Sequence, residues 1–214
     1  QGIQEKGKEI RTFMPKFGCI NERRNQLHEV IRLSGMNLII DDNDHPLIIK
    51  VASIQAARMQ VYFIDSEDYF QRKAVFHDKE KGTFFKDNDE RAIFFARGVL
   101  ETVKKLGWVP DIIHCHGWMT SLIPLYIKTS YKKDPIFENS KVVFSLYNND
   151  FKPALNKKFA KKAMMDGIEE EDIIDYNSTS FVGLTKAAIN SSDAIIQASE
   201  TINKELETHF NEID

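Results

Sequence analysis

Residues 110–128 read Pro-Asp-Ile-Ile-His-Cys-His-Gly-Trp-Met-Thr-Ser-Leu-Ile-Pro-Leu-Tyr-Ile-Lys, and this stretch decides the fold. Its first part, Asp111 to His114, is short, apolar and β-branched, which is typical of a strand buried in a parallel sheet. Gly117 interrupts the pattern, and apolar residues then recur at helical spacing, with Pro124 in a first turn that tolerates proline. A strand therefore runs directly into a helix. Because ligands of open α/β sheets bind beyond the carboxyl ends of such strands, three residues are candidates for a site. They are His114, His116 and Trp118.

The composition of the 214-residue chain is that of an ordinary packed protein. Hydrophobic residues make up 42%, which favours a folded core over disorder. The formal net charge of −3 argues against a nucleic-acid partner, and the lack of a long apolar run argues against a membrane partner. Cys19 and Cys115 lie far apart, so we expect no disulfide framework and a reducing, cytoplasmic location.

The predicted secondary structure changes along the chain from consecutive strands to alternating helices and strands. Between Leu27 and Ile64 the predicted strands follow one another without helices, which favours antiparallel pairing. From Asp89 onward, helices and strands alternate, ending in a buried strand over 194–198 and a last helix capped by Ser199. This order predicts an α/β fold: a Rossmann-like, mostly parallel sheet with helices on both faces and an antiparallel β insertion.

Several short motifs follow one another along nearly the whole chain. They are Glu9-Ile10-Arg11 with Met14-Pro15-Lys16-Phe17-Gly18; Val61-Tyr62-Phe63-Ile64-Asp65; Tyr69-Phe70-Gln71-Arg72; Asp87-Asn88-Asp89-Glu90-Arg91 with Phe94-Phe95; Pro110-Asp111-Ile112-Ile113-His114-Cys115-His116-Gly117-Trp118; and a fainter one from Phe181 through Leu184-Thr185-Lys186-Ala187 to Ser192-Asp193-Ala194. In this order and spacing, the motifs resemble the amino-terminal catalytic domain of bacterial glycogen synthases and plant starch synthases.

The resemblance implies a GT-B glycosyltransferase, in which two Rossmann-like domains enclose the active site. Residues 1–214 would form a single domain of this type, the half that holds the glucan acceptor. The implied activity is α-1,4-glucan synthesis from ADP-glucose, with no cofactor and no metal ion. The implied partners are an α-glucan and either a separate donor domain or a second copy of the chain.

Four departures from the family pattern bear on activity. The family's glycine-rich loop would lie upstream of Gln1, and no donor-binding domain comes before Asp214. Gly117 stands where the family has the aspartate of His-x-His-Asp-Trp, and Tyr147 stands where it has an active-site histidine. The asparagine after that histidine is retained as Asn148. We therefore expect this polypeptide alone to be inactive in glucosyl transfer.

The resemblance and the strand ends together define the candidate site. The positions of the family's catalytic residues are Gly117, Tyr147 and Asn148. The candidate substrate-binding residues are His114, His116, Trp118 and Asp150, the last being the carboxylate that follows the Tyr147 strand.

Simpler interpretations stay open beside these. His114 and His116 point to one face of a strand, where they can fill a polar strand end as well as bind a ligand. Trp118 can stack on a sugar or pack in the core. Four lysines after residue 156 are most simply a solvated helix face: Lys157, Lys158, Lys161 and Lys162. For the chain as a whole, the alternatives are a non-catalytic carbohydrate-binding or regulatory relative, and a protein-interaction module that keeps only the fold.

Overall fold

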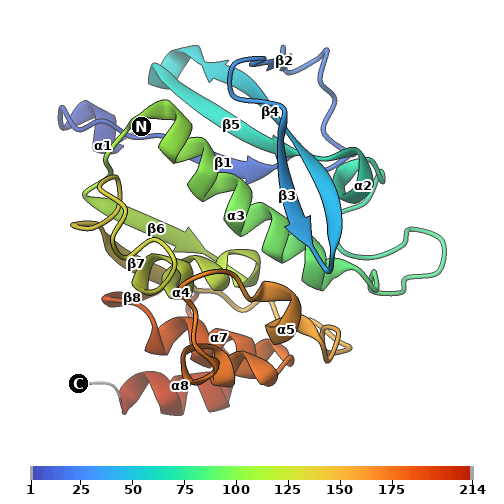
Figure 1. The fold of residues 1–214 in the computed structure, drawn as a ribbon, viewed down its shortest axis with the longest axis vertical. Helices are drawn as coiled ribbons and strands as arrows, with labels where there is room; N and C mark the ends of the chain where they lie inside the picture. Colours follow the sequence, from blue (N-terminus) through green and yellow to red (C-terminus); the bar gives the residue numbers. More distant parts are fainter. Residues whose placement is uncertain (1, 213–214) are drawn as a thin grey trace. The chain divides into compact units, whose positions relative to one another are not determined.

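The computed structural model describes residues 2–212, and the chain divides into two compact units, Gln1–Thr83 and Phe84–Asp214 (Figure 1). Each unit contains a sheet of its own. The fold class is α/β with a parallel sheet and helices, as predicted. That one domain spans residues 1–214 stays a prediction.

The first unit is built around the long strand β4. Its elements are α1 (Gly2–Glu5), β1 (Thr12–Pro15), β2 (His28–Glu29), β3 (Met36–Ile40), β4 (Asn43–Ile54), a 3₁₀ turn (Gln55–Ala57), β5 (Met59–Asp65) and α2 (Glu67–Phe70). The strand order is β1-β5-β4-β2, and β3 also pairs with β4. Because β4 runs antiparallel to β2, β3 and β5, whereas β1 and β5 are parallel, the predicted antiparallel insertion is confirmed.

The acidic stretch after β3 is a tight hairpin turn. Ile40 pairs with Asn43, so only Asp41 and Asp42 form the turn, and both have positive φ angles, of 49° and 62°. Aspartate tolerates this left-handed region better than most residues, which explains the acidic sequence without a calcium ion. The turn is short because β4 already begins at Asn43 and includes Pro46.

The second unit alternates helices with parallel strands. Its elements are α3 (Asn88–Leu106), β6 (Ile112–His116), a 3₁₀ turn (Trp118–Thr120), α4 (Leu122–Lys128), β7 (Lys141–Leu146), α5 (Phe159–Ala163), α6 (Glu170–Ile173), a 3₁₀ turn (Ile174–Asn177), α7 (Phe181–Asn190), β8 (Ala194–Gln197) and α8 (Lys204–Asn211). The sheet order is β6-β7-β8, and both pairs are parallel. Residues 110–128 thus form the predicted strand and helix.

The two faces of this parallel sheet differ in burial. Residues of one face are almost inaccessible to solvent, namely Cys115, Val142, Phe144 and Leu146. On the other face the β6 residues Ile112, His114 and His116 are exposed, with Ile112 at 55%, whereas Ser145 of β7 is buried. The prediction that β8 is buried was wrong, since Ile196 is 46% exposed.

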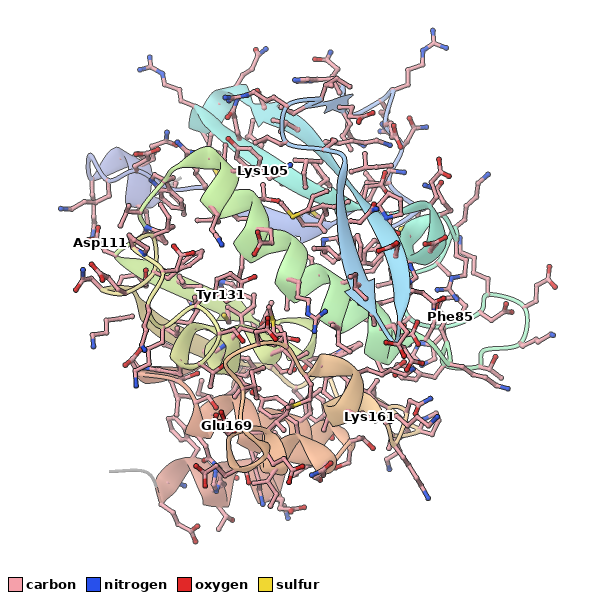
Figure 2. The ribbon with its side chains drawn as sticks, viewed as in Figure 1. Phe85, Lys105, Asp111, Tyr131, Lys161 and Glu169 are labelled. Atoms are coloured by element: carbon pink, nitrogen blue, oxygen red, sulfur yellow. The ribbon has the colours of Figure 1, made fainter. Side chains whose placement is uncertain are left out.

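Helix α3 is the longest helix of the second unit. Apolar and aromatic residues along it are buried, and Gly107 ends it with a φ angle of 61°, as expected for a left-handed cap. Tyr131 is buried against it and donates a hydrogen bond of 2.5 Å to Glu101 Oε1. Figure 2 labels Tyr131 together with the exposed side chains of Lys161 and Glu169.

One of the four lysines predicted to be solvated is buried. Lys162 Nζ lies 2.9 Å from Asp89 Oδ2 and 2.5 Å from Glu90 Oε1, at the first turn of α3. Burial raises the pKa of Asp89, and the Lys162 ammonium opposes that rise. The prediction of one solvated helix face was wrong for Lys162, because α5 begins only at Phe159 and its Lys162 side chain points toward α3.

Candidate functional site

The candidate site lies at the carboxyl edge of the parallel sheet of the second unit. His116 ends β6, Tyr147 directly follows β7, and Ser199 comes two residues after β8. Because the three strands are parallel, all three chain segments leave the sheet at the same edge. Side chains from residues 114–118, 145–150 and 199–203 meet there.

Two histidines on one face of β6 form the first part of the site. The ring centres of His114 and His116 are 4.0 Å apart, which confirms that both point to the same face. His114 Nε2 shares a hydrogen bond of 2.7 Å with Ser145 Oγ, and His116 Nδ1 shares one of 2.7 Å with the Tyr147 hydroxyl. Burial lowers the pKa of His114, and burial together with the neighbouring His114 lowers the pKa of His116. Neutral imidazoles, which both donate and accept hydrogen bonds, are thus favoured.

Gly117 redirects the chain directly after β6. Its φ of 76° and ψ of 175° lie in a region that is essentially restricted to glycine. A Cβ atom built at this position would lie 3.2 Å from Asn149 Nδ2. The missing carboxylate at the family's aspartate position therefore coincides with a backbone conformation that an aspartate would strain.

Trp118 is buried in an aromatic cluster beneath this region and does not present an exposed ring surface. It is 3% exposed, and its ring centre lies 4.8 Å from that of Phe151 and 6.2 Å from that of Phe84. Phe84 and Phe151 stack on each other with centres 5.2 Å apart. The structure shows the packed alternative for Trp118, and a contact with a sugar stays a prediction.

The residues after β7 are held by the segment that follows β8. The backbone N–H of Asn148 donates to Ser199 Oγ at 3.1 Å, and Asn148 Nδ2 donates to Thr201 Oγ1 at 3.4 Å. Asn203 Nδ2 donates to Asp150 Oδ2 at 3.0 Å. Sequence reasoning missed Ser199, Thr201 and Asn203 as site residues. Their position just beyond the end of a parallel strand was the available signal.

Ser199 does not cap the last helix, contrary to the prediction. Asn203 does so, because its Oδ1 accepts a hydrogen bond of 3.0 Å from the backbone N–H of Glu205. The predicted cap was placed too early, since Ser199 and Asn203 are both good capping residues and sequence alone ranks them alike.

Cys115 is a core residue and takes no part in the exposed face. It is 1% exposed, and burial raises the pKa of its thiol to about 12, so the thiol is protonated near neutral pH. Within residues 2–212, no three side chains of histidine, cysteine, aspartate or glutamate are grouped in a way that could hold a metal ion. None of the helices described in that range has the length and apolar composition needed to cross a membrane.

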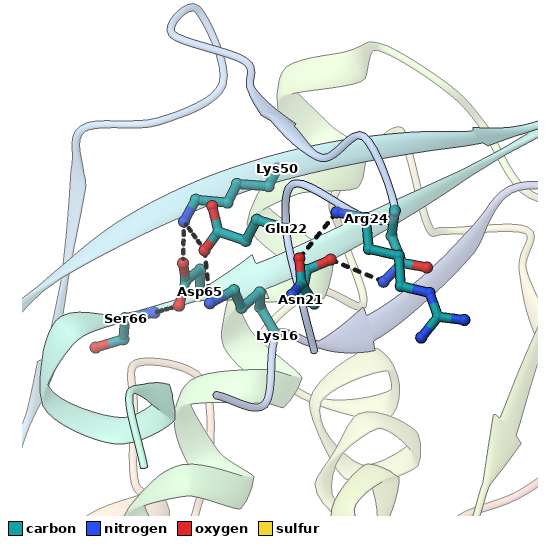
Figure 3. A network of polar contacts seen from close by, with 8 residues as sticks. Lys16, Asn21, Glu22, Arg24, Lys50, Asp65 and Ser66 are labelled. Carbon is teal, nitrogen blue, oxygen red and sulfur yellow. Dashed lines mark hydrogen bonds and ion pairs between the residues drawn. The ribbon is translucent and has the colours of Figure 1, made fainter. Parts of the chain in front are cut away.

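A second cluster of charged side chains lies in the first unit, at the carboxyl ends of β1 and β5 (Figure 3). Glu22 Oε1 lies 2.6 Å from Lys16 Nζ and 2.7 Å from Lys50 Nζ. Lys50 Nζ also lies 2.8 Å from Asp65 Oδ2, and Asp65 Oδ1 accepts from the backbone N–H of Ser66 at 2.9 Å. The two cations and two carboxylates neutralise each other. Through these ion pairs, Glu22 connects the loop of residues 16–27 to the sheet.

The sheet order and the polar carboxyl edge place the second unit among open α/β folds, in which ligands bind beyond the carboxyl ends of the strands. The chain belongs to the family of starch synthase catalytic domains, because the model of that family matches residues 1–213.

Similar proteins support the same assignment. The glycogen synthase of Pelodictyon phaeoclathratiforme is 34% identical over 211 residues, which cover 98% of this chain and 43% of that protein. The glycogen synthase of Chlorobium limicola is 43% identical over 148 residues, which cover 69% of this chain and 30% of that protein. The chain thus spans less than half the length of these relatives.

A solved structure has the same fold. It is the catalytic domain of Starch Synthase IV from Arabidopsis thaliana bound to ADP and acarbose, with a TM-score of 0.67 and 20% sequence identity. The similarity covers 91% of this chain and 38% of that one.

Proposed function

We propose that residues 1–214 supply the glucan-acceptor side of a glycogen or starch synthase, which extends an α-1,4-glucan with glucose from ADP-glucose. Membership of the starch synthase catalytic domain family supports this proposal, as do relatives that are glycogen synthases. The non-catalytic alternative has no comparable support. The two free cysteines, Cys19 and Cys115, suit a reducing compartment such as the cytoplasm.

The observation that carries the proposal is the convergence of His116, Tyr147, Asn148 and Asp150 at one sheet edge. These side chains offer imidazole, phenol, amide and carboxylate groups, which together donate to and accept from sugar hydroxyls. They are neutral or anionic, and a diphosphate would instead need cations or helix dipoles. The edge therefore suits the acceptor sugar and the positive charge that develops on a transferred glucosyl group.

Tyr147 and Asn148 stand at two of the family's catalytic positions, and in this proposal both contact the sugar. Tyr147 would hydrogen-bond a sugar hydroxyl through its phenol, which His116 orients. Asn148 would present its side-chain carbonyl, because its amide nitrogen is already directed at Thr201. In this proposal the donor-binding wall comes from a second domain or a second molecule, and neither a metal ion nor an organic cofactor takes part.

Titration with maltoheptaose, followed by NMR of the labelled protein, tests the acceptor site. We expect shifts at Gly117, Tyr147 and Asn148 and a dissociation constant of about 1 mM, since an open site excludes little water. The variant Tyr147→Phe should bind more weakly because it loses the phenol hydroxyl. Absence of shifts at saturating sugar, or shifts confined to distant residues, would contradict the proposal.

Transfer is tested separately with radiolabelled ADP-glucose and glycogen. We expect residues 1–214 alone to incorporate no label above a control without protein, because a cleft enzyme needs both walls to orient donor and acceptor. Incorporation above that control would show that this polypeptide alone is catalytically competent.

A further inference from the structure

Asn203 connects the last helix to the candidate site. Its Oδ1 caps α8 by accepting from the backbone N–H of Glu205, while its Nδ2 donates to Asp150 Oδ2. Both hydrogen bonds are 3.0 Å long, and Asp150 lies 53 positions away in the sequence. One amide side chain therefore fixes a helix terminus and a carboxylate at the same time.

The position of Asn203 is fixed by the hydrophobic core. Its neighbour Ile202 is 9% exposed, and Leu206, in the first turn of α8, is fully buried. These two apolar anchors flank Asn203 and hold it in place, although the residue itself is near the surface. A carboxylate bound to such a group loses rotational freedom that an exposed aspartate would otherwise keep.

The same segment holds the neighbouring site residue. Ser199 Oγ and Thr201 Oγ1 accept hydrogen bonds from the backbone and the side chain of Asn148. The backbone N–H of Ala198 donates to the carbonyl of Leu146 at 2.9 Å, which continues the pairing beyond β8. Residues 199–203 thus run beside residues 147–150 and contact them at three side chains.

We propose that residues 199–203 are the positioning segment of the glucan site, and that Asn203 is a positioning residue that orients the carboxylate of Asp150. Asp150 Oδ1 has no hydrogen bond among the described residues and is the oxygen left for a sugar hydroxyl. This inference rests on the proposed function, because it names residues that would set glucan affinity at the same edge.

A purely structural role as a helix cap is the competing explanation, and two substitutions separate it from the proposal. Asn203→Ser and Asn203→Asp both keep a good N-cap, so α8 should stay intact and the melting temperature should change little. Asn203→Ser loses the amide donor to Asp150, and Asn203→Asp places a second carboxylate beside it. We expect the dissociation constant for maltoheptaose to rise about threefold and about tenfold, respectively.

A matched control has the same kind of contact elsewhere in the unit. Asn190 Nδ2 donates to Asp175 Oδ2 at 3.1 Å, at the end of α7 rather than at the strand edge. Asn190→Ser should leave the affinity for maltoheptaose unchanged. If it weakens binding as much as Asn203→Ser does, the effect is not specific to the site and the inference fails.

A double-mutant cycle completes the test without depending on the helix cap. Asp150→Ala, Asn203→Ser and the double variant are titrated with maltoheptaose. Because Asn203 acts through Asp150, the double variant should bind as weakly as Asp150→Ala alone, and additive losses would overturn the inference. Unchanged affinity in Asn203→Ser would also overturn it while leaving the proposed function intact. No binding by the unaltered protein would contradict the proposed function and this inference with it.

Discussion

Gly117 differs from the aspartate of the family pattern, and it also adopts a backbone conformation that favours glycine. The family pattern has an aspartate here, but in this chain the backbone turns with a φ of 76° directly after β6. Only glycine enters that conformation without strain. Restoring a carboxylate at position 117 would thus change the backbone as well as the charge.

The replacement Gly117→Ala should destabilise the protein by about 1–3 kcal/mol, because a Cβ atom is forced into a glycine-only region. Urea unfolding monitored by circular dichroism measures the loss. Gly2→Ala is the matched control, since a Cβ atom at Gly2 meets nothing within 4 Å and its φ angle is not positive. Equal stability of Gly117→Ala and the unaltered chain would mean that this turn adapts to a side chain.

At the scale of elements, the charged cluster in the first unit ties an irregular segment to a sheet. Residues 16–27 contain no helix or strand, yet Glu22 reaches both Lys16 and Lys50. Hydrogen bonds from Lys16 and then Lys50 lower the pKa of Glu22. Lys16 is buried, so its ammonium needs the Glu22 carboxylate to compensate its charge.

Glu22→Gln should cost about 1–2 kcal/mol at pH 7, less than a fully buried pair, because the Glu22 side chain is 39% exposed. A pKa lowered by folding stabilises the protein above the unfolded pKa, and that contribution is lost as the pH falls through the folded value. The difference between the two proteins should therefore shrink on acidification below the ordinary glutamate pKa of 4.5.

Urea unfolding at a series of pH values measures this prediction. Glu9→Gln is its control, because Glu9 is 62% exposed in its pair with Arg11 and should contribute close to nothing. A difference for Glu22→Gln that does not depend on pH would show that the glutamate acts by packing rather than by charge.

At the scale of the whole molecule, residues 75–87 span the boundary between the two units, which lies at Thr83 and Phe84. None of residues 75–87 is buried, and residues 78–83 form a turn in which the Asp78 N–H donates to the Thr83 carbonyl. The lysine-bearing segment 151–158 also lacks helices and strands, but Phe151 and Leu155 are buried there. Protease access should differ between the two segments accordingly.

Brief digestion with trypsin should cut first at Lys79 or Lys81, because both are exposed and lie in the turn of residues 78–83. Mass spectrometry of the fragments identifies the sites, and a variant with both lysines changed to glutamine should survive longer. A first cut at Lys157 or Lys158 would contradict the prediction.

Much of the fold could be read from local patterns. The strand and helix of residues 110–128, the antiparallel insertion and the common face of His114 and His116 all follow from periodicities of two or 3.6 residues. Ordered motifs identified the family on their own. These properties were accessible because each depends on residues close together in the chain.

Only the tertiary structure decided which polar groups meet. The sequence by itself determined that His116, Asn148 and Asp150 lie near strand ends, but not that Tyr147 bonds His116 or that Asn203 holds Asp150. It could not place Lys162 against Asp89, nor reveal the backbone conformation of Gly117. The physical reason is that such contacts depend on strand register, loop path and burial, which arise from packing across many tens of residues rather than from any local pattern.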